Sequence, residues 1–462
     1  MATAEKGRQS VAIIGSGMAG LVAAYLLRTD RHHRFDVEIF EKQNRLSLDS
    51  ASLTVSTQHG TQTVQDRIDL PMRVFASGFY ENLKRMYDYF GIRYASPRFI
   101  YTLSAIPEDA PNAIHPHFIH SSNNHQMPPL RPERSSWATW LIEVLYLAIC
   151  YYYFTACCFF VKPREADASR AAESFREYMD RINLPRYYVQ RYVLPLMSSV
   201  TTCPHNVLLD FPAIDIVDYE TKTFRKPHYT VVGGVNRVQA KLSEGQKVTY
   251  GAAVTAVENV GSKVQVTWKN EQTGSVESRL FDQAIMAVTP DVVGAIFPPL
   301  KSAMTAIPTT YVGAVVHRDY ARLSTCNRAV EGQVPSDYGR SQLIHMSSTA
   351  SDTESTHHHP SSALITTAPI VPIDPATVLH RVTFTRVLRT PTSRQLLNEI
   401  FNERKSWHAV EKPQCQWRNG DGNVWLVGGW CWDGMVMLEG CIASALRVAN
   451  KLDIEVPWAM KH

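Results

Sequence analysis

The stretch that decides the fold is VAIIGSGMAGLVAAYLLRTDRHHRFDVEIFEK, residues 11–42. Four apolar residues at 11–14 predict a buried parallel strand, and a glycine-rich turn follows them directly. Residues 21–27 have the apolar spacing of a helix, and residues 35–40 predict a second strand. This order of strand, glycine turn, helix and strand is typical of the β–α–β unit that opens a dinucleotide-binding fold.

The glycines of this turn and the acid after the second strand have separate tasks. Gly15 allows the tight turn, Gly17 lets a pyrophosphate approach the backbone, and Gly20 lets the helix pack close to the strand. The helix start adds unpaired N–H groups and partial positive charge. Glu41 follows about 20 residues later, where the fold needs an acceptor for the adenosine ribose hydroxyls. The stretch therefore predicts a dinucleotide site.

Length and composition set limits on the rest of the chain. A chain of 462 residues is long for one core, so two closely packed domains are expected. A net charge of +4 without a block of like charges gives no support to a nucleic-acid partner. The eight cysteines lack metal-type spacing, and the first ten residues are polar, which favours reduced thiols, no N-terminal targeting segment and a cytoplasmic location.

The segment 137–161, WATWLIEVLYLAICYYYFTACCFFV, is the most apolar part of the chain. From 144 to 161 it carries no charge, which is near the minimum length for a bilayer span. Glu143 and the tyrosines near the middle of the segment oppose a span. Peripheral membrane contact, or an apolar wall of a substrate domain, is therefore favoured over a transmembrane helix.

Two further regions are expected to be irregular. Residues 95–135 are rich in Pro, Asn, His and Ser and predict a long excursion without regular structure. Residues 348–362, STASDTESTHHHPSS, predict a solvated loop. Its three consecutive histidines cannot easily converge on one ion, and no acid or cysteine is spaced to join them, so no metal site is expected.

Four pieces of the chain together resemble a known family. They are GSGMAG at 15–20 with Glu41, TVVGGV at 230–235, FDQAIMAVTP at 281–290 and VWLVGGWCWDGMVMLEGCIASALRVA at 424–449. In order and separation they resemble the FAD-dependent amine oxidase, phytoene desaturase and protoporphyrinogen oxidase superfamily. With IDLPMRVF, KPHYTVVGG and VVHRD added, the chain looks closest to uncharacterised bacterial and fungal flavin-containing oxidoreductases of that superfamily.

The resemblance implies an α/β fold with a Rossmann-like FAD-binding domain assembled from discontinuous segments and an inserted α+β substrate domain. We assign residues 1–70, 225–300 and 405–462 to the FAD-binding domain. Residues 71–224 and 301–404 then form the substrate domain.

The resemblance also implies which residues bind the cofactor. Glu41 would bind the ribose, Val254 would reach the adenine through its backbone, and residues 437–441 would face the flavin. Gly440 is expected to let the backbone lie close to the isoalloxazine ring, beside a helix start that stabilises negative charge there. The full set is Gly15, Gly17, Met18, Ala19, Gly20, Glu41, Lys42, Arg45, Val254, Gly429, Trp430, Met437, Leu438, Glu439, Gly440 and Cys441.

The chain departs from the family pattern at two places. Arg45 is present, but residues 46–49 replace the glycines and second arginine that usually follow, so this loop departs from the family's usual phosphate and isoalloxazine contacts. Trp430, Cys431 and Trp432 replace an acid after the C-terminal glycine, and they could stack near the flavin, form a substrate wall or pack in the core. No cysteine–histidine pair suits covalent attachment, so a dissociable, non-covalent FAD is expected.

The leading hypothesis is an FAD-dependent oxidase or desaturase that removes a hydride from a lipophilic small molecule, in specialised or lipid metabolism, with oxygen or another electron acceptor. An FAD-dependent isomerase or cyclase without net oxidation, and a non-catalytic redox-sensing dinucleotide-binding protein, are the alternatives. The candidates for catalysis are His205, His228, His317 and Asp319. Flavin oxidation can also proceed without a protein base, so the catalytic group stays open at this point, as does the substrate.

Overall fold

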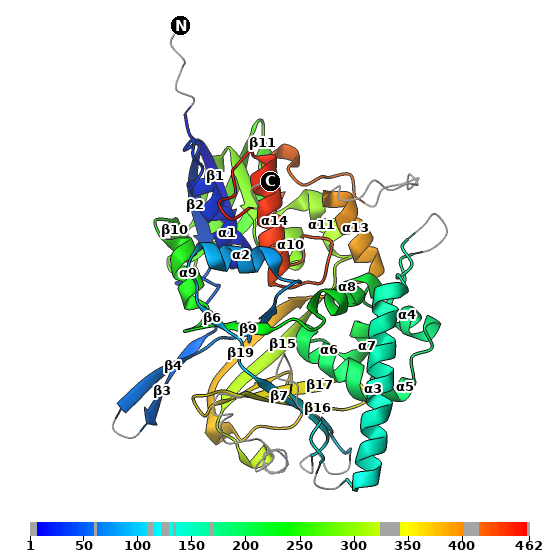
Figure 1. Ribbon diagram of the computed structural model, residues 1–462. Helices are drawn as coiled ribbons and strands as arrows, with labels where there is room; N and C mark the ends of the chain where they lie inside the picture. The colour runs from blue at the N-terminus through cyan, green and yellow to red at the C-terminus, as the bar shows by residue number, and fades with distance from the viewer. Residues whose placement is uncertain are drawn as a thin grey trace.

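The computed structural model describes residues 7–59, 62–108, 114–121, 129–132, 135–166, 171–323, 342–401 and 415–459. The chain forms two packed bodies, one above the other in Figure 1. The upper body holds both the first strand and the last helix of the chain, whereas the lower body holds the middle of the chain.

The upper body is built on a five-stranded parallel sheet in the order β10-β2-β1-β14-β20. Its strands are β1 (Gln9–Ile14), β2 (Phe35–Glu41), β10 (Lys247–Tyr250), β14 (Gln283–Met286) and β20 (Val424–Leu426). They come from three distant parts of the chain, which confirms the Rossmann-like fold assembled from discontinuous segments. The exact domain boundaries given above stay predictions.

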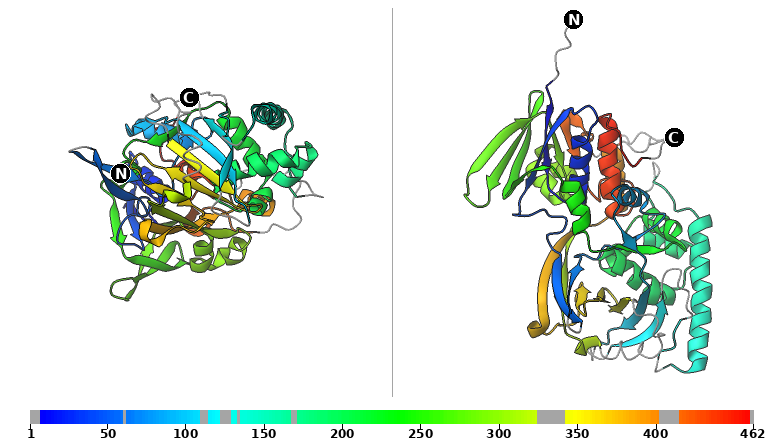
Figure 2. Two further views of the ribbon diagram at one scale, coloured as in Figure 1. Left: turned by 90° about the horizontal axis from the view of Figure 1, so that it is seen from below. Right: turned by 60° about the vertical axis from the view of Figure 1, so that its left-hand side comes forward.

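Both faces of this sheet are covered, as the apolar strands require. Helices α1 (Met18–Arg28) and α14 (Leu438–Lys451) share one core with Ile13 and Ile39. On the other face, Phe40 packs on Trp268 with ring centroids 4.8 Å apart. This second layer contains β11 (Ala252–Val260), β12 (Lys263–Asn270), β13 (Val276–Phe281), α10 (Pro290–Ile296) and α13 (Pro391–Phe401), and Figure 2 shows the small sheet beside the parallel one.

The lower body contains a seven-stranded sheet in the order β19-β15-β18-β17-β16-β7-β8. All of its pairings are antiparallel except that of β16 with β7. Its strands are β7 (Phe99–Ala105), β8 (His115–Ser121), β15 (Thr309–His317), β16 (Gln342–Ser348), β17 (Thr353–His358), β18 (Leu364–Thr367) and β19 (Val378–Val387).

This sheet corrects two predictions. The region 95–135 was expected to be irregular, but it supplies β7 and β8. The region 348–362 was expected to be a solvated loop, but His357 and His358 lie in β17, and His357 is buried. Both segments are polar in sequence, and they become strands because β7 and β17 each pair with β16, so the partner strand and not the local composition decides.

Helices flank the sheet on the side where α3 (Trp137–Phe160) runs along the outer edge of the lower body (Figures 1 and 2). The Ser136 side chain caps α3 by accepting from the Thr139 N–H at 3.1 Å. The other helices here are α4 (Phe175–Arg181), α5 (Arg186–Tyr188), α6 (Leu194–Thr201), α7 (His205–Leu209) and α8 (Ala213–Thr223), with a π-helical turn at Val189–Val193 between α5 and α6.

Short elements join the two bodies. Strand β9 (His228–Val231) pairs with β5 (Phe75–Ala76) and with β6 (Tyr94–Ala95). The remaining elements are β3 (Leu53–His59), β4 (Gln62–Ile68), α2 (Glu81–Tyr89), α9 (Asn236–Ser243) and α11 (Lys301–Met304). Strand β9 therefore pairs with two strands from within residues 71–224 before the chain enters the upper sheet at β10.

Candidate functional site

The turn between β1 and α1 leaves space beside one glycine and none beside the other two. Gly15 has a φ of +100°, and a Cβ on it would lie 2.8 Å from the Ala287 carbonyl oxygen. A Cβ on Gly20 would lie 2.1 Å from the Gly15 carbonyl oxygen. At Gly17 the nearest atom would be the Ser47 hydroxyl, at 4.0 Å. Gly15 and Gly20 are therefore required by close packing within the protein. Gly17, by contrast, faces an open space next to Ser47 that a ligand can fill, and this space is called the cradle.

Glu41, at the end of β2, lies beside this glycine turn. Its buried carboxylate accepts from the Ser16 N–H at 3.1 Å, from the Gln43 N–H at 2.9 Å and from the Ser16 hydroxyl. The Ser47 N–H donates to the Ser16 hydroxyl at 2.8 Å, which fixes the following loop against the glycine turn. The acid that the sequence assigns to the ribose therefore lies beside the glycines, at the end of β2.

The loop after Glu41 differs from the family pattern for a visible reason. Leu46 and Leu48 are buried in the core of the upper body, so apolar anchors take the place of the usual glycines. Lys42 and Arg45, predicted to contact the cofactor, are exposed. The strand that carries Val254 is tied to this loop by the Gly251 N–H, which donates to the Gln43 carbonyl at 3.1 Å.

The start of α14 lies against the same glycine turn. A Cβ on Gly429 would lie 3.4 Å from the Cys441 Sγ and 3.0 Å from the Met437 carbonyl oxygen. Burial raises the pKa of the Cys441 thiol to about 11, so this group is a neutral thiol near pH 7. A hydrogen bond between the Cys441 thiol and the Ala19 backbone brings this helix start against the β1–α1 turn, although the two are far apart in sequence.

Two residues at this helix start have structural tasks that the sequence did not reveal. The Glu439 carboxylate accepts from the Asn82 N–H at 3.0 Å, the Asn82 amide at 2.7 Å and the Leu83 N–H at 3.0 Å, so it binds the first turn of α2. A Cβ on Gly440 would lie 2.4 Å from both the Gly429 carbonyl oxygen and the Trp432 Nε1. Close packing of protein against protein therefore already requires glycine at 440, before any flavin is considered.

A cavity of about 160 Å³ lies between the two bodies, where β14 and β20 of the parallel sheet end. The carboxyl ends of such strands are where open α/β sheets bind ligands. Its walls are mainly apolar, with Arg386 as the charged exception. The described residues that line it are Thr201, Phe211, Thr289, Thr385, Arg386, Val387, Gly429, Trp430, Met435, Val436 and Met437.

Of these lining residues, the sequence predicted Gly429, Trp430 and Met437. Trp430 is a wall of the cavity, and its indole N–H donates to the Val288 carbonyl at 3.0 Å. Trp432 instead packs edge-on against Phe79, with ring centroids 5.8 Å apart. The other lining residues come from the ends of α6, β14 and β19, from Phe211 before α8 and from the loop at 435–436, and no local pattern in the sequence marks them.

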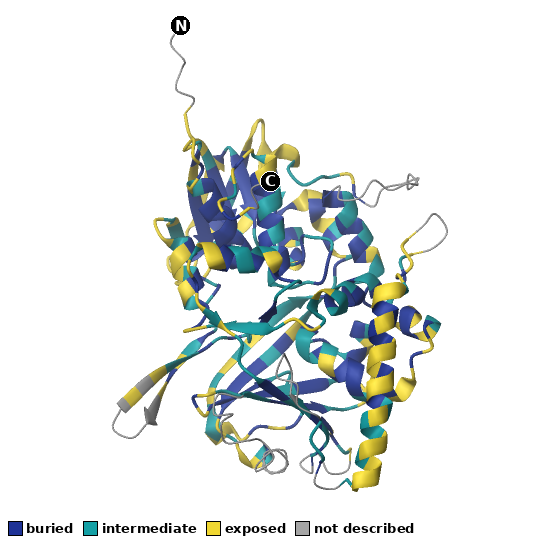
Figure 3. Ribbon diagram, viewed as in Figure 1, coloured by how far each residue is buried: buried dark blue, intermediate teal, exposed yellow. Residues whose placement is uncertain are grey.

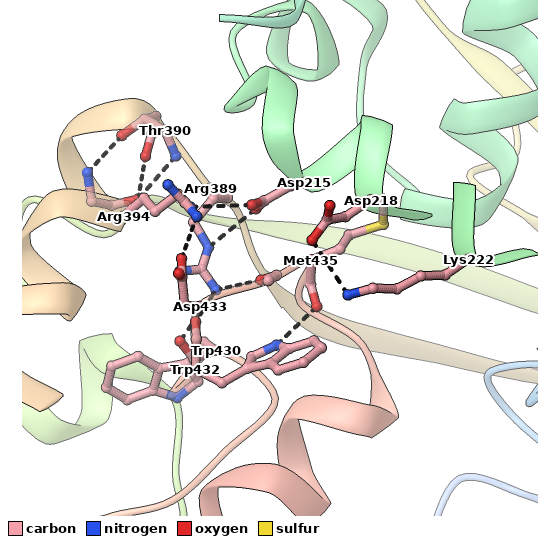
Figure 4. Close-up of polar contacts among 12 residues, drawn as sticks. Asp215, Asp218, Lys222, Arg389, Thr390, Arg394, Trp430, Trp432, Asp433 and Met435 are labelled. Carbon is pink, nitrogen blue, oxygen red and sulfur yellow. Dashed lines mark hydrogen bonds and ion pairs between the residues drawn. The ribbon is translucent and has the colours of Figure 1, made fainter. Parts of the chain in front are cut away.

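A buried ionic network holds the loop that carries Trp430 and Met435 (Figure 4). One Arg389 nitrogen donates to the carbonyl oxygens of Trp430 at 3.3 Å, Trp432 at 3.1 Å and Gly434 at 2.8 Å. The Asp215 carboxylate of α8 lies 3.8 Å from the Arg389 Nε. Arg389 and Asp215 are almost completely buried, so α8 of the lower body and the cavity loop of the upper body share one set of charges.

Arg394 extends this network. Its guanidinium contacts Asp215 at 3.4 Å and Asp433 at 2.6 Å. Two arginines therefore face two carboxylates, which is the balance that buried charges require. The network positions the cavity wall and does not itself line the cavity.

The four candidates for catalysis lie outside the lining of this cavity. His205, at the start of α7, hydrogen-bonds to the Thr353 hydroxyl at 2.8 Å, and His317, at the end of β15, to the Thr366 hydroxyl at 2.8 Å. The Asp319 N–H donates to the His317 Nδ1 at 3.2 Å, whereas His228 lies in β9. The structure brings together only His317 and Asp319 of these four, and none of them is among the described residues that line the cavity.

Two of the three consecutive histidines hydrogen-bond to protein partners. The His357 Nε2 lies 2.9 Å from the Gln342 side-chain oxygen, and the His359 Nδ1 lies 2.8 Å from the Ser361 hydroxyl. Within the part of the chain that the structure describes, no group of three His, Cys, Asp or Glu side chains could hold a metal ion.

Buried histidines of the lower sheet predict acid sensitivity. Burial lowers the pKa of His317 to about 4, of His345 to about 3 and of His357 to about 3. Below pH 6.5 the unfolded chain binds protons that the folded chain refuses, so the free energy of unfolding should fall by about 1.4 kcal/mol per pH unit for each histidine. It should stay level above pH 7.

Urea denaturation between pH 8 and pH 4.5 measures this dependence. His345→Gln removes one of these groups, so below pH 6 the free energy of unfolding should fall less steeply with decreasing pH, by about 1.4 kcal/mol per pH unit. An unfolding free energy that is the same at pH 5 and at pH 7.5 would contradict the prediction.

Comparison with known proteins agrees with this geometry. Residues 13–90 match the family described as NAD(P)-binding Rossmann-like domain, and residues 161–369 match flavin containing amine oxidoreductase. No curated protein matches the chain.

Two solved structures are similar over nearly the whole chain. One is a CLA-producing fatty acid isomerase from P. acnes, with a TM-score of 0.60 and 11% identity over 97% of this chain and 99% of that one. The other is a putative protoporphyrinogen oxidase from Exiguobacterium sp. 255-15, with a TM-score of 0.55 and 11% identity over 96% of this chain and 99% of that one. At such identities the likeness shows a shared fold.

Proposed function

This chain belongs to the FAD-dependent amine oxidase, phytoene desaturase and protoporphyrinogen oxidase superfamily and is an FAD-dependent oxidoreductase; from that premise we propose that it binds FAD non-covalently and oxidises a lipophilic small molecule. One observation carries the proposal. The cradle at Gly17 and Glu41 adjoins, through the start of α14, a mainly apolar cavity between the two bodies.

The residues present fit this cofactor. The β1–α1 turn would hold the pyrophosphate through the space beside Gly17 and the N–H groups of Met18 and Ala19, and Glu41 would hold the ribose. Residues 429–438 would adjoin the flavin ring. When bound, FAD supplies the two-electron redox chemistry.

The chain itself contributes orientation and exclusion of water. Phe211, Val387, Trp430 and Met435 form apolar walls that favour a lipophilic substrate over a hydrated one. The Arg389 network keeps the Trp430–Met435 wall in place. No ionisable group besides Arg386 is among the described lining residues, which supports hydride removal without a protein base. Oxygen or another acceptor would take the electrons, and specialised or lipid metabolism is the setting we propose.

The purified protein should be yellow and should carry about one FAD per chain. Acid precipitation should release all of the flavin into the supernatant, because the described cysteines beside the proposed flavin position, Cys431 and Cys441, are neutral thiols whose pKa burial raises. Absorbance of supernatant and pellet measures the release. Flavin that stays with the pellet would refute non-covalent binding, and a colourless protein that gains no spectrum on incubation with FAD would refute the proposal as a whole.

Isomerisation without net oxidation is the second candidate, and the fold shared with a fatty acid isomerase favours it. The same cradle and cavity would serve both reactions. Candidate substrates added without oxygen separate them: a flavin spectrum that bleaches and recovers with air indicates oxidation. An altered substrate with an unchanged spectrum indicates isomerisation.

We further propose that α3 binds a membrane surface. The structure has one helix, Trp137–Phe160, long and apolar enough to cross a membrane, among the residues that it describes. Its outer face is exposed (Figure 3), and the side chains there are apolar, with Ile142 at 68%, Ile149 at 70% and Phe160 at 85% exposure.

The inner face of α3 argues for surface contact over a span. Cys150, Phe154 and Cys157 are buried against the lower body. Glu143 accepts from the Tyr187 hydroxyl at 3.0 Å and from the Tyr192 hydroxyl, so the charge within the apolar stretch is turned toward the protein. A helix packed along one side can insert its other side into the interfacial region of a bilayer without crossing it.

The triple variant Ile142→Ser, Ile149→Ser, Phe160→Ser should reduce co-sedimentation with phosphatidylcholine–phosphatidylglycerol vesicles at least tenfold, since each side chain loses roughly 1.5–3 kcal/mol of apolar burial when fully inserted. Val276→Ser with Leu280→Ser, exposed apolar positions on β13, is the matched control and should bind as the parent does. Equal binding of the parent and the triple variant would overturn the surface assignment. Release from membranes by detergent alone, and not by carbonate, would favour a span.

A further inference from the structure

Arg386 is a half-buried cation that faces the cavity without an acidic partner among the described residues. It lies near the end of β19 and lines the cavity beside Thr385 and Val387. Among the described residues, no Asp or Glu forms an ion pair with it. Charges removed from water are normally paired, because an unpaired one is costly. The described part of the protein thus supplies Arg386 with a hydroxyl partner, Thr202, but with no carboxylate.

Other arginines of the chain with buried side chains show the usual arrangement. Arg322 lies 2.6 Å from Glu354, Arg389 lies 3.8 Å from Asp215, and Arg394 lies 2.6 Å from Asp433. Each of these guanidiniums is buried and has a carboxylate beside it. Arg386 departs from this pattern at the one position where a guanidinium lines the cavity.

The orientation of Arg386 suits a ligand. Its Nε donates to the Thr202 hydroxyl at 2.5 Å, at the C-terminal cap of α6, which holds the guanidinium plane in place. Its two terminal nitrogens have no hydrogen-bond partner among the described residues. Two free N–H groups on the outer edge of a guanidinium match the two oxygens of a carboxylate.

The surroundings strengthen the positive field. Burial lowers the pKa of the Arg386 guanidinium, and the positive charge of Arg73 lowers it further, whereas Tyr80 opposes the shift. The Arg73 Nε is itself buried without a hydrogen-bond partner. An anion in the cavity would relieve this repulsion between like charges, whereas an amine would add to it.

We propose that Arg386 binds the carboxylate of the substrate, so that the substrate class is an apolar carboxylic acid. This inference rests on the proposed function, because it assigns a ligand to the same cavity. The carboxylate lies at the Arg386 end, and the apolar part of the molecule lies along Phe211, Trp430 and Met435. An amine substrate is disfavoured at this position, although amines give the family its name.

The test compares octanoate with octanamide, which share their apolar chain but differ in charge. Each is titrated into the holoprotein, and the dissociation constant is taken from calorimetry and from the change in the flavin spectrum. Octanoate should bind at least tenfold more tightly than octanamide. Arg386→Gln should weaken octanoate binding roughly 10- to 100-fold and leave octanamide unchanged, and Arg386→Lys should restore part of the loss.

Arg381→Gln is the matched control, because Arg381 lies on the same strand but is exposed. It should bind octanoate as the parent does. Equal affinity of the parent for octanoate and octanamide would overturn the proposal, and so would Arg386→Gln with unchanged octanoate binding. If Arg386→Gln alters the flavin content or spectrum without ligand and leaves octanoate affinity intact, the cation serves the cofactor and the proposal fails.

Calorimetry also separates this proposal from the proposed function. Charge-selective binding of octanoate to a protein without flavin would support the Arg386 site while the assignment of FAD fails. A flavoprotein without charge selectivity would retain the oxidoreductase proposal and reject the carboxylate.

Discussion

Gly17→Val is expected to abolish FAD binding while the protein stays folded. The nearest atom to a Cβ at this position is the Ser47 hydroxyl at 4.0 Å, so the added side chain finds space in the protein. In the proposed site the pyrophosphate would meet the backbone in that space, and a branched side chain would exclude it. Flavin content after purification should fall below a tenth of the parent value, and the circular dichroism spectrum should not change.

Gly20→Val is the contrasting variant. A Cβ at Gly20 would lie 2.1 Å from the Gly15 carbonyl oxygen and 3.0 Å from the Ala287 Cβ. Helix α1 would have to move away from β1, so this variant should fail to fold and not merely lose flavin. Gly17→Val protein with full flavin content would remove the cradle from the binding site.

Arg389→Met is expected to lower the free energy of unfolding by about 3–5 kcal/mol, because it leaves the buried Asp215 carboxylate with less compensation. It also frees three carbonyl groups of the Trp430–Met435 loop. Flavin affinity should therefore fall with stability. Urea denaturation of the apoprotein and titration with FAD measure the two effects separately.

The control for this variant lies on the same helix as Asp215. Lys222 and Asp218 form a pair at 3.3 Å whose side chains are 49% and 42% exposed (Figure 4). Lys222→Met should change the unfolding free energy by less than about 1 kcal/mol, because water screens this pair. Equal effects of Arg389→Met and Lys222→Met would show that the buried network does not hold the loop.

The sequence was sufficient where structure depends on local pattern. Residues 11–42 predicted β1, α1 and β2, because a buried strand, a glycine turn and an amphipathic helix each leave a mark on neighbouring residues. The resemblance of the C-terminal stretch placed a helix after Gly429, and α14 begins at Leu438. The superfamily followed from the order of these pieces.

Tertiary structure decided what depends on distant partners. Strand β7 exists because β16, more than 200 residues later, hydrogen-bonds to it, so the polar region 95–135 gave no sign of it. His357 is buried in β17 for the same reason, although its run of histidines is typical of a solvated loop.

The residues of the candidate site also fall into two groups, those that local sequence predicts and those that only the packing decides. Glycine and acid positions at the cradle could be predicted, since a pyrophosphate and a ribose demand those residue types at that spacing. Arg386 and the Asp215–Arg389 pair could not, because an arginine in a sequence carries no sign of whether a carboxylate will lie beside it. Only the packing of β19, α6, α8 and the Trp430–Met435 loop decides that Arg389 is paired and that Arg386 faces the cavity alone.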